Sequence, residues 1–445
     1  MVPRLPLMVI CLSTLLALAT FSAPLTALEA MTVSLSLTEG EQAWVMSAMP
    51  LGAAVGLLIA GALGDTYGRR KTFAGGLWVT AVFSLVAALS QNGPMLILAR
   101  IAQGLGSAGI MACGLGLVGQ IYTGAARERA AAGWAAGLGA GVSLGPILTA
   151  VLLPLGGWQL AHLLLALAAT VLGWAARRLP ESVPIPHRLD LAGSLALLVG
   201  LSSLLAALIE VRFGLTGLVA VLLGLSIVAL VLFVRVERRV ANPILRVDLF
   251  QRVAFSGATL AAFASGAGVL SLMSLVPTIL ERGAGLSPIA SAVILLAWSG
   301  VTVLSALGAR YLPSRLAPRA RVIIAILGCT AGQLLLLMTG EAMAWYAVMP
   351  GLLMAGLANG VLNASLGHAA VESVPPDRAA MGSAANNTAR YLGSALGIAL
   401  VSVLIAGTRP GDLFAHWHQA VWMTAVFSLA GLGCMVLLNR GAARA

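Results

Sequence analysis

Long apolar segments repeat along this chain, and they limit what it can fold into more than any other feature. Fourteen are present, and about 20 apolar residues suffice to cross a bilayer as a helix. The chain has 445 residues, of which 60% are hydrophobic and only 9% are charged, whereas a soluble protein carries about a quarter charged residues. We therefore predict an all-α polytopic membrane protein. The segments are residues 6–28, 42–64, 72–91, 93–122, 130–153, 158–176, 190–209, 214–234, 254–280, 287–311, 320–340, 342–367, 379–406 and 415–438.

The distribution of Lys and Arg tests this count and gives an orientation. If the N-terminus is cytoplasmic, 21 of the 26 basic residues fall in cytoplasmic segments and three fall outside the cell. The other two, Arg100 and Arg390, lie within predicted spans. Basic residues concentrate in the cytoplasmic loops of membrane proteins. We therefore predict a multi-pass protein of the inner or plasma membrane with both termini cytoplasmic.

Two long cytoplasmic connections divide the chain. Residues 175–190 and 235–252 separate six spans, two spans and six spans. The predicted parts are a first six-helix bundle (1–178), two additional helices with their linkers (179–252) and a second six-helix bundle (253–445). Two bundles of equal size indicate an internal duplication of the kind found in transporters.

A dense charge cluster, GALGDTYGRRK, occupies residues 61–71 between two apolar segments. Glycines permit a tight turn between packed helices, and Asp65 can cap a helix or pair with an arginine across the bundle interface. The pattern G-x-x-x-D-x-x-G-R-R, formed by Gly61, Asp65, Gly68, Arg69 and Arg70, resembles the signature loop of the major facilitator superfamily. That resemblance implies a gating role on the inner side. The alternative is a positively charged anchor with no gating role.

The fourth span adds to the resemblance through RIAQGLGSAG, which contains Arg100, Gln103 and Gly104. A charged side chain inside the bilayer costs at least about 2.5–3.5 kcal/mol. Arg100 should therefore face polar partners or a wet cavity. The alternative is that its long side chain carries the guanidinium to the outer membrane–water interface.

Two further spans carry motifs that resemble those of exporters in this superfamily. The antiporter-like motif consists of Gly137, Gly141, Gly145 and Pro146, although Thr149 and Ala150 stand where the family usually has two more glycines. Glycines at this spacing line one helix face and let a neighbour approach. In span 13, Asn387 and Arg390 resemble the fourteen-helix drug:proton antiporter branch, as does the 6+2+6 count. The resemblance implies the major facilitator fold with 14 transmembrane helices.

Proton antiport needs a carboxylate that is buried in the translocation path during part of the cycle. None of the fifteen acidic residues lies at the centre of a predicted span, and span 1 has no acid before Glu29, where relatives commonly carry an aspartate. Three alternatives remain open. Glu29 or Glu210 carries the proton, His162 or His368 does so, or transport is not tightly coupled to protons.

The shortage of acids also bears on the substrate. A di-cationic substrate would want a buried counter-charge, so neutral, zwitterionic or anionic amphiphiles fit better. Uncharged side chains could supply hydrogen bonds in a substrate cavity, or could only hold helices together. They are Gln103, Gln333, Asn359, Asn363 and Asn386.

Other classes of function find little support. The four cysteines stand alone, so no metal site is expected. The histidines do not converge, the only lysine does not follow a glycine as in a phosphate loop, and no basic patch suggests nucleic acid. We expect a monomeric secondary transporter, not an enzyme, with no cofactor. It would export an amphipathic drug or metabolite by alternating access, with protons as the possible coupling ion. The alternative is an uptake or facilitated-diffusion carrier for a small metabolite.

Overall fold

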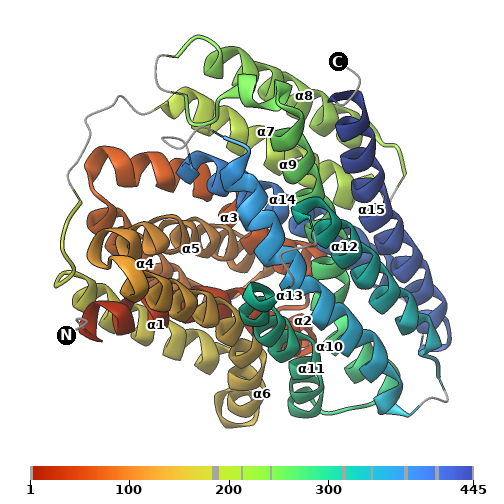
Figure 1. The fold of residues 1–445 in the computed structure, drawn as a ribbon. Helices are drawn as coiled ribbons and strands as arrows, with labels where there is room; N and C mark the ends of the chain where they lie inside the picture. Colours follow the sequence, from red (N-terminus) through yellow and green to blue (C-terminus); the bar gives the residue numbers. More distant parts are fainter. Residues whose placement is uncertain are drawn as a thin grey trace.

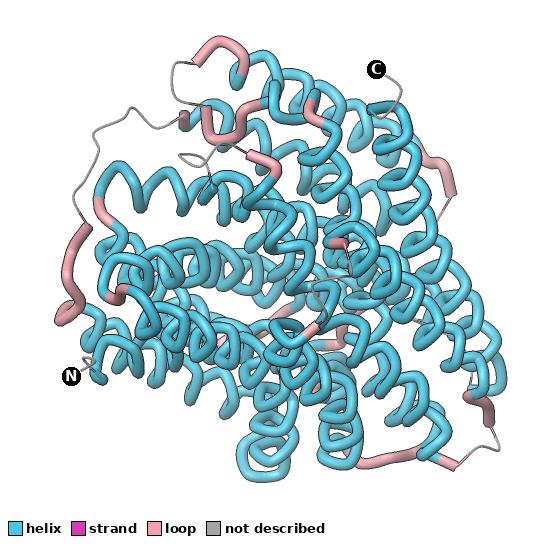
Figure 2. The backbone as a smooth tube through the Cα atoms, in the orientation of Figure 1, coloured by secondary structure: helices cyan, strands magenta, loops and turns pink. Residues whose placement is uncertain are grey.

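The computed structural model describes residues 4–182, 190–211, 214–240, 243–312, 317–341, 344–374, 379–405 and 410–442. In this part of the chain every regular element is a helix, and the long helices lie side by side (Figures 1 and 2). The all-α prediction is therefore confirmed. Residues 1–3 and 443–445 at the chain ends, and residues 183–189 of the predicted 175–190 connection, lie outside the described residues. The predictions of cytoplasmic termini and of that connection fall on them.

The N-terminal half, as the term is used here, runs from α1 to α6. Its elements are α1 (Arg4–Ser22), the short η1 (Ala23–Thr26), α2 (Leu28–Leu35), α3 (Glu39–Tyr67), α4 (Arg69–Ala88), α5 (Gly93–Ile121) and α6 (Gly124–Ala176).

Two more helices and the C-terminal half follow. The pair is α7 (Leu191–Glu210) and α8 (Gly217–Glu237). The C-terminal half contains η3 (Val247–Gln251), α9 (Val253–Ser265), the π-helical turn η4 (Gly266–Leu270), α10 (Ser271–Ala284), α11 (Pro288–Gly308), η5 (Ala309–Tyr311), α12 (Pro318–Leu335), η6 (Leu336–Met338), η7 (Trp345–Val348), α13 (Met349–Glu372), α14 (Ala379–Ile405), η9 (Pro410–Asp412) and α15 (Leu413–Ala442).

Thirteen helices of the described residues are long and apolar enough to cross a membrane. One of them, α6, has 53 residues and is about 80 Å long at 1.5 Å per residue, which is more than twice the thickness of a hydrocarbon core. Its backbone leaves helical geometry at Gly156 and Gly157, between the predicted segments 130–153 and 158–176. Among the described residues, helix therefore makes up most of each of the fourteen predicted segments.

The first predicted segment, 6–28, is not one continuous helix. The α-helix ends at Ser22, a 3₁₀ turn follows, and a second short helix runs from Leu28. Pro24 lies in this turn and has no N–H, so it cannot donate to the carbonyl of Thr20, four residues earlier. Apolar length predicted the span, and the proline explains its break.

Close packing joins α1 to α6 through the glycines at 137, 141 and 145. A Cβ atom at any of the three would run into carbonyl oxygens of α1. The two helices also share hydrogen bonds, from the Ser22 hydroxyl to the Gly141 carbonyl at 3.2 Å and from the Thr26 hydroxyl to the Pro146 carbonyl at 2.9 Å. These glycines do let a neighbouring helix approach, and that neighbour is α1.

The two halves meet mainly along two helix pairs. In Figure 1, α3 and α14 lie next to each other near the middle of the molecule, and α6 and α11 form the second contact. Ser143 of α6 donates to Ser299 of α11 at 2.8 Å or accepts from it. The α7–α8 pair packs through α7 against both α3 and α14, in an apolar cluster that includes Leu51, Leu205 and Ala395.

Candidate functional site

The turn between α3 and α4 depends on Gly68. Its φ of +107° is a conformation that residues with a side chain rarely adopt. A Cβ atom here would also collide with the carboxylate of Glu181, which lies after α6. We call this end of the molecule the Gly68 end, and the opposite end the Glu29 end.

The first turn of α4 binds the segment after α6. The backbone N–H of Arg70 donates to Glu181 Oε1 at 2.9 Å, and that of Arg69 donates to the Ser182 hydroxyl at 2.8 Å. The Arg70 guanidinium adds an ion pair to Glu181 Oε2 at 3.3 Å. A helix N-terminus has unpaired N–H groups and attracts negative charge, so Glu181 and Ser182 cap a helix whose own preceding residue, Gly68, has no side chain to do so.

The sequence reasoning missed Glu181 as part of this site. Its one signal is that it follows the apolar segment 158–176 on the same predicted side as Arg69 and Arg70. A third helix fixes the segment, because Gln120 of α5 donates its amide to the Glu181 carbonyl at 2.7 Å.

Asp65 has a different partner from the one expected. Its Oδ1 lies 3.2 Å from the Arg69 guanidinium, one turn further on, and both side chains are partly exposed. This pair joins α3 to α4 within the same half, whereas we expected Asp65 to pair across the two halves or to cap a helix. Glu181 does the capping. At Gly61 no atom lies within 4 Å of a Cβ position, so packing does not require that glycine.

Arg100 lies in α5 and is only 1% exposed. Its guanidinium donates to the carbonyls of Thr20 at 2.7 Å and Phe21 at 3.0 Å, to the Gln103 amide oxygen at 3.1 Å, and, through Nε, to the Val45 carbonyl at 3.4 Å. The break in α1 frees the first of these carbonyls. Arg100 thus has the polar partners that the sequence required, and it does not reach the interface.

Arg390 of α14, the second arginine inside a predicted span, is half-buried. It donates to the side-chain oxygens of Asn363 on α13 and Asn387 one turn earlier, both at 2.9 Å. Its Nε is buried and has no hydrogen-bond partner among the described residues. The predicted span-13 residues Asn387 and Arg390 are therefore in direct contact.

The other uncharged candidates are not brought together. Gln103 donates to Ser84, Gln333 accepts from Ser428, and both contacts are 3.0 Å long. Asn386 donates to the Ala258 carbonyl at 3.2 Å, and Asn359 is buried in α13. Gln103, Gln333 and Asn386 join neighbouring helices, and Gly104 packs against the α3 backbone. Two of these candidates also accept from an arginine, Gln103 from Arg100 and Asn363 from Arg390.

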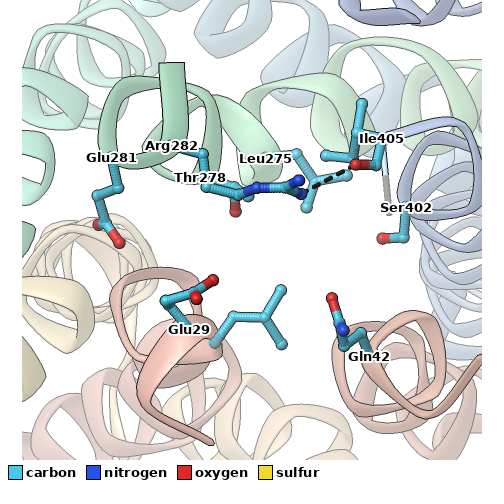
Figure 3. Close-up of a pocket in the computed structure, with 9 residues that line it drawn as sticks. Glu29, Gln42, Leu275, Thr278, Glu281, Arg282, Ser402 and Ile405 are labelled. Atoms are coloured by element: carbon cyan, nitrogen blue, oxygen red, sulfur yellow. Dashed lines mark hydrogen bonds between the residues drawn. The ribbon is translucent and has the colours of Figure 1, made fainter. Parts of the chain in front are cut away.

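A pocket lies between the two halves at the Glu29 end (Figure 3). The N-terminal half contributes Leu28, Glu29 and Gln42, and the C-terminal half contributes Leu275, Thr278, Glu281, Arg282, Ser402 and Ile405. Figure 3 shows the carboxylates of Glu29 and Glu281 on neighbouring sides of this pocket. Arg282 turns toward α14 and donates to the Ile405 carbonyl at 2.9 Å.

Glu281 is a second residue that sequence reasoning did not single out. Its Oε1 is buried with no hydrogen-bond partner among the described residues. The predicted span ends one residue before it, at residue 280, whereas the helix continues to Ala284. Glu210 ends α7 and does not line this pocket.

The two histidine candidates lie apart from this pocket. His162 is fully buried and its Nδ1 lies 3.1 Å from the Trp158 carbonyl. His368 is exposed beside Glu372, with 3.1 Å between the two side chains.

Comparison with known families now identifies the architecture. The model of the Major Facilitator Superfamily matches residues 10–398, which is most of the chain. The chain belongs to the major facilitator superfamily. The resemblance of its motifs to this superfamily is confirmed.

Several curated relatives are named for drug resistance or efflux. Multidrug resistance protein Stp of Mycobacterium tuberculosis is 28% identical over 87% of this chain and 73% of its own length. Multidrug efflux pump LfrA of Mycolicibacterium smegmatis is 29% identical over 82% of this chain and 73% of its own. The methylenomycin A resistance protein of Bacillus subtilis is 27% identical over 96% and 92%.

Solved structures support the same fold. The POT family transporter PepTSo matches with a TM-score of 0.71 at 16% identity, covering 99% of this chain and 98% of that one. The human organic anion transporter MFSD10 matches with a TM-score of 0.62 at 19% identity, covering 96% and 99%. At these identities the likeness concerns the fold.

Proposed function

We propose that this protein is a secondary active transporter that exports an amphipathic drug or metabolite. The observation that carries the proposal is the match to the superfamily over residues 10–398, together with relatives that are named for multidrug resistance and efflux and that align over more than four fifths of this chain. Members of this superfamily are in general carriers and not enzymes.

The mechanism we propose is alternating access between the N-terminal half and the C-terminal half. It is supported by the two contacts between halves, α3–α14 and α6–α11, and by a pocket whose lining comes from both halves at the Glu29 end. The arrangement would be six, two and six spans, with boundaries near residues 178 and 252. The α7–α8 pair would brace the α3–α14 contact, against which α7 packs.

The Gly68 end would face the cytoplasm, because the predicted loops at that end carry 21 basic residues against three at the other. Both termini would then lie inside the cell, and the protein would act in the inner or plasma membrane as a monomer. The Gly68 turn would then belong to the inner gate. Its ion pairs and its cap on α4 tie α3, α4 and the segment after α6 together.

Proton coupling would use the pocket at the Glu29 end. Glu29 and Glu281 lie on different halves and line the same pocket, so their separation changes whenever the halves move. Two neighbouring carboxylates repel each other when both are ionised, which favours the protonated form of one of them. Moving them apart removes this repulsion. One proton could therefore be taken up when the pocket closes and released when it opens.

A carrier without tight proton coupling is the second candidate function, for uptake or facilitated diffusion. The observation in its favour is that the acidic residues of the described helices lie at or near helix ends, and none lies near the middle of a helix that could span a membrane.

The test is counterflow in proteoliposomes with amphiphiles of different charge, at two pH values. Accumulation driven by an imposed pH gradient supports a coupled exporter. Exchange that ignores the gradient supports the second candidate. No exchange for any amphiphile at either pH would contradict the exporter.

A further inference from the structure

The half-buried Arg390 of the C-terminal half lies far from either end of its helix. Arg390 is the twelfth of the 27 residues of α14, so it lies about 17 Å from the start of a helix about 40 Å long. A cation at such a depth is expensive, and charged groups there are paired or line a polar path.

The partners of Arg390 carry no charge. Both side-chain contacts are amide oxygens, from Asn363 and Asn387, and Nε has no partner among the described residues. None of the ion pairs found in this part of the chain involves Arg390. The positive charge is therefore oriented but not neutralised.

The backbone of α14 is closely packed at Arg390. Gly266, in the π-helical turn η4, lies against the Arg390 carbonyl so closely that a Cβ atom there would collide with it. Gly393 packs in the same way against α9. A π-helical turn inside a helix is often found at a functional site.

Tyr391, the residue after Arg390, contacts the N-terminal half. Tyr391 is buried beside Arg390, with the guanidinium carbon 5.5 Å from the centre of its ring. Its hydroxyl donates to the sulfur of Met111 on α5 at 3.6 Å. Arg390 thus lies next to a contact between the two halves, where a substrate passing between them would travel.

We propose that Arg390, oriented by Asn363 and Asn387, binds an anionic group of the transported substrate, a carboxylate or a sulfonate. The inference rests on the proposed export function and narrows its substrates to amphipathic organic anions and zwitterions. A guanidinium has five donors in a planar fork that matches such oxyanions. The two amides engage the terminal nitrogens and leave Nε for the ligand.

The experiment measures binding and transport of two dyes that share a xanthene ring, anionic 6-carboxyfluorescein and cationic rhodamine 123. Fluorescence anisotropy with the full-length purified protein gives the dissociation constants, and proteoliposomes give transport. The variants are Arg390→Gln, Arg390→Lys and Asn363→Asp. Arg238→Gln, at the exposed end of α8, controls for the loss of one positive charge.

We expect Arg390→Gln to weaken binding of 6-carboxyfluorescein ten- to a hundredfold, as befits the loss of a charge-assisted contact, and Arg390→Lys to restore part of it. Rhodamine 123 binding should stay within a factor of about two. Asn363→Asp keeps the arginine but places a carboxylate on it, so it should block the anionic dye equally while the protein stays folded. A purely structural role for Arg390 predicts normal dye binding in Asn363→Asp.

Unchanged binding of 6-carboxyfluorescein in Asn363→Asp would overturn the inference, even if Arg390→Gln fails to fold. So would a wild-type protein that binds and transports rhodamine 123 alone, and in that case the export function stands. Conversely, Arg390-dependent binding of the anionic dye without transport of either dye supports the site and contradicts export.

Discussion

Arg100 and Arg390, the two arginines inside predicted spans, both bind uncharged oxygens, but we assign them opposite roles. Arg100 in the N-terminal half directs its guanidinium to three backbone carbonyls and one amide oxygen. Arg390 in the C-terminal half has two amide oxygens and an unpaired Nε.

The state of the neighbouring helix explains this difference. Helix α1 breaks at Pro24, so carbonyls that would have been bonded inside a helix are free for Arg100. Helix α13, which supplies Asn363, runs unbroken from Met349 to Glu372, so its carbonyls are already used and Arg390 depends on side chains. One arginine completes the fold, and the other remains available to a ligand.

The largest effect we expect concerns the packing that holds α1 in place for Arg100. Gly141→Ala puts a methyl group into the α1 backbone, and such overpacking costs about 1–3 kcal/mol. The monodisperse fraction after size-exclusion chromatography should fall sharply. Gly75→Ala in α4, where no atom lies within 4 Å of the Cβ position, is the matched control and should behave as wild type. Equal behaviour of the two variants would show that the α1–α6 contact is not tight.

The next largest effect concerns the pocket at the Glu29 end. Glu29→Gln and Glu281→Gln each remove one member of the proposed proton-sharing pair, so each should abolish transport driven by a pH gradient and leave substrate exchange intact. Both rates are measured in proteoliposomes, one as the flux driven by a pH gradient and the other as the flux of substrate exchange. If only Glu281→Gln has this effect, Glu29 is an ordinary solvated acid. If gradient-driven transport survives in both, the proton is carried elsewhere or not at all.

A smaller effect is expected at the Gly68 end. Glu181→Gln keeps an oxygen for the Arg70 N–H but removes the charge that pairs with the Arg70 guanidinium. The protein should fold normally and transport more slowly, by a factor of about ten if the lost contact is worth about 1.4 kcal/mol at the gate. Transport is measured as initial counterflow rates, with Ser182→Ala as the companion variant. A normal rate in Glu181→Gln would remove this segment from the gate.

The smallest effect should come from Asp65→Asn. Its pair with Arg69 is partly exposed, and exposed pairs contribute about 0.2–1 kcal/mol. We expect normal insertion and a moderate slowing of transport. A rate equal to wild type at equal expression would mean that the loop serves only as an anchor.

Much of the fold followed from the sequence because apolar length alone defines a span. The predicted limits agree with the helices within a few residues at most places, and the glycines at 137, 141 and 145 correctly predicted a close neighbour. The break of α1 was missed because a proline inside an apolar segment can either kink a helix or end it. The membrane requires only that the freed carbonyls find another donor, and Arg100 supplies one.

The site was less predictable because it depends on contacts between distant segments. Asp65 was expected to cap a helix or to pair across the bundle interface, yet it pairs with Arg69, one turn away across Gly68. Glu181 and Glu281 could not be singled out, because their roles arise only when α4 meets the end of α6, and when α10 faces α2. Nothing in the sequence distinguishes a side chain that joins two helices from one that binds substrate. This is the case for Gln103, Gln333 and Asn386.

The most direct test of the division of roles is thermal unfolding of Arg100→Gln and Arg390→Gln, measured side by side in one detergent. Arg100→Gln leaves several buried carbonyls unpaired, and each costs about 1–3 kcal/mol, so its melting temperature should fall by many degrees. Arg390→Gln loses two bonds to side chains that can rearrange, and its melting temperature should stay close to wild type. An equal fall in both variants, or a larger fall for Arg390→Gln, would contradict the account.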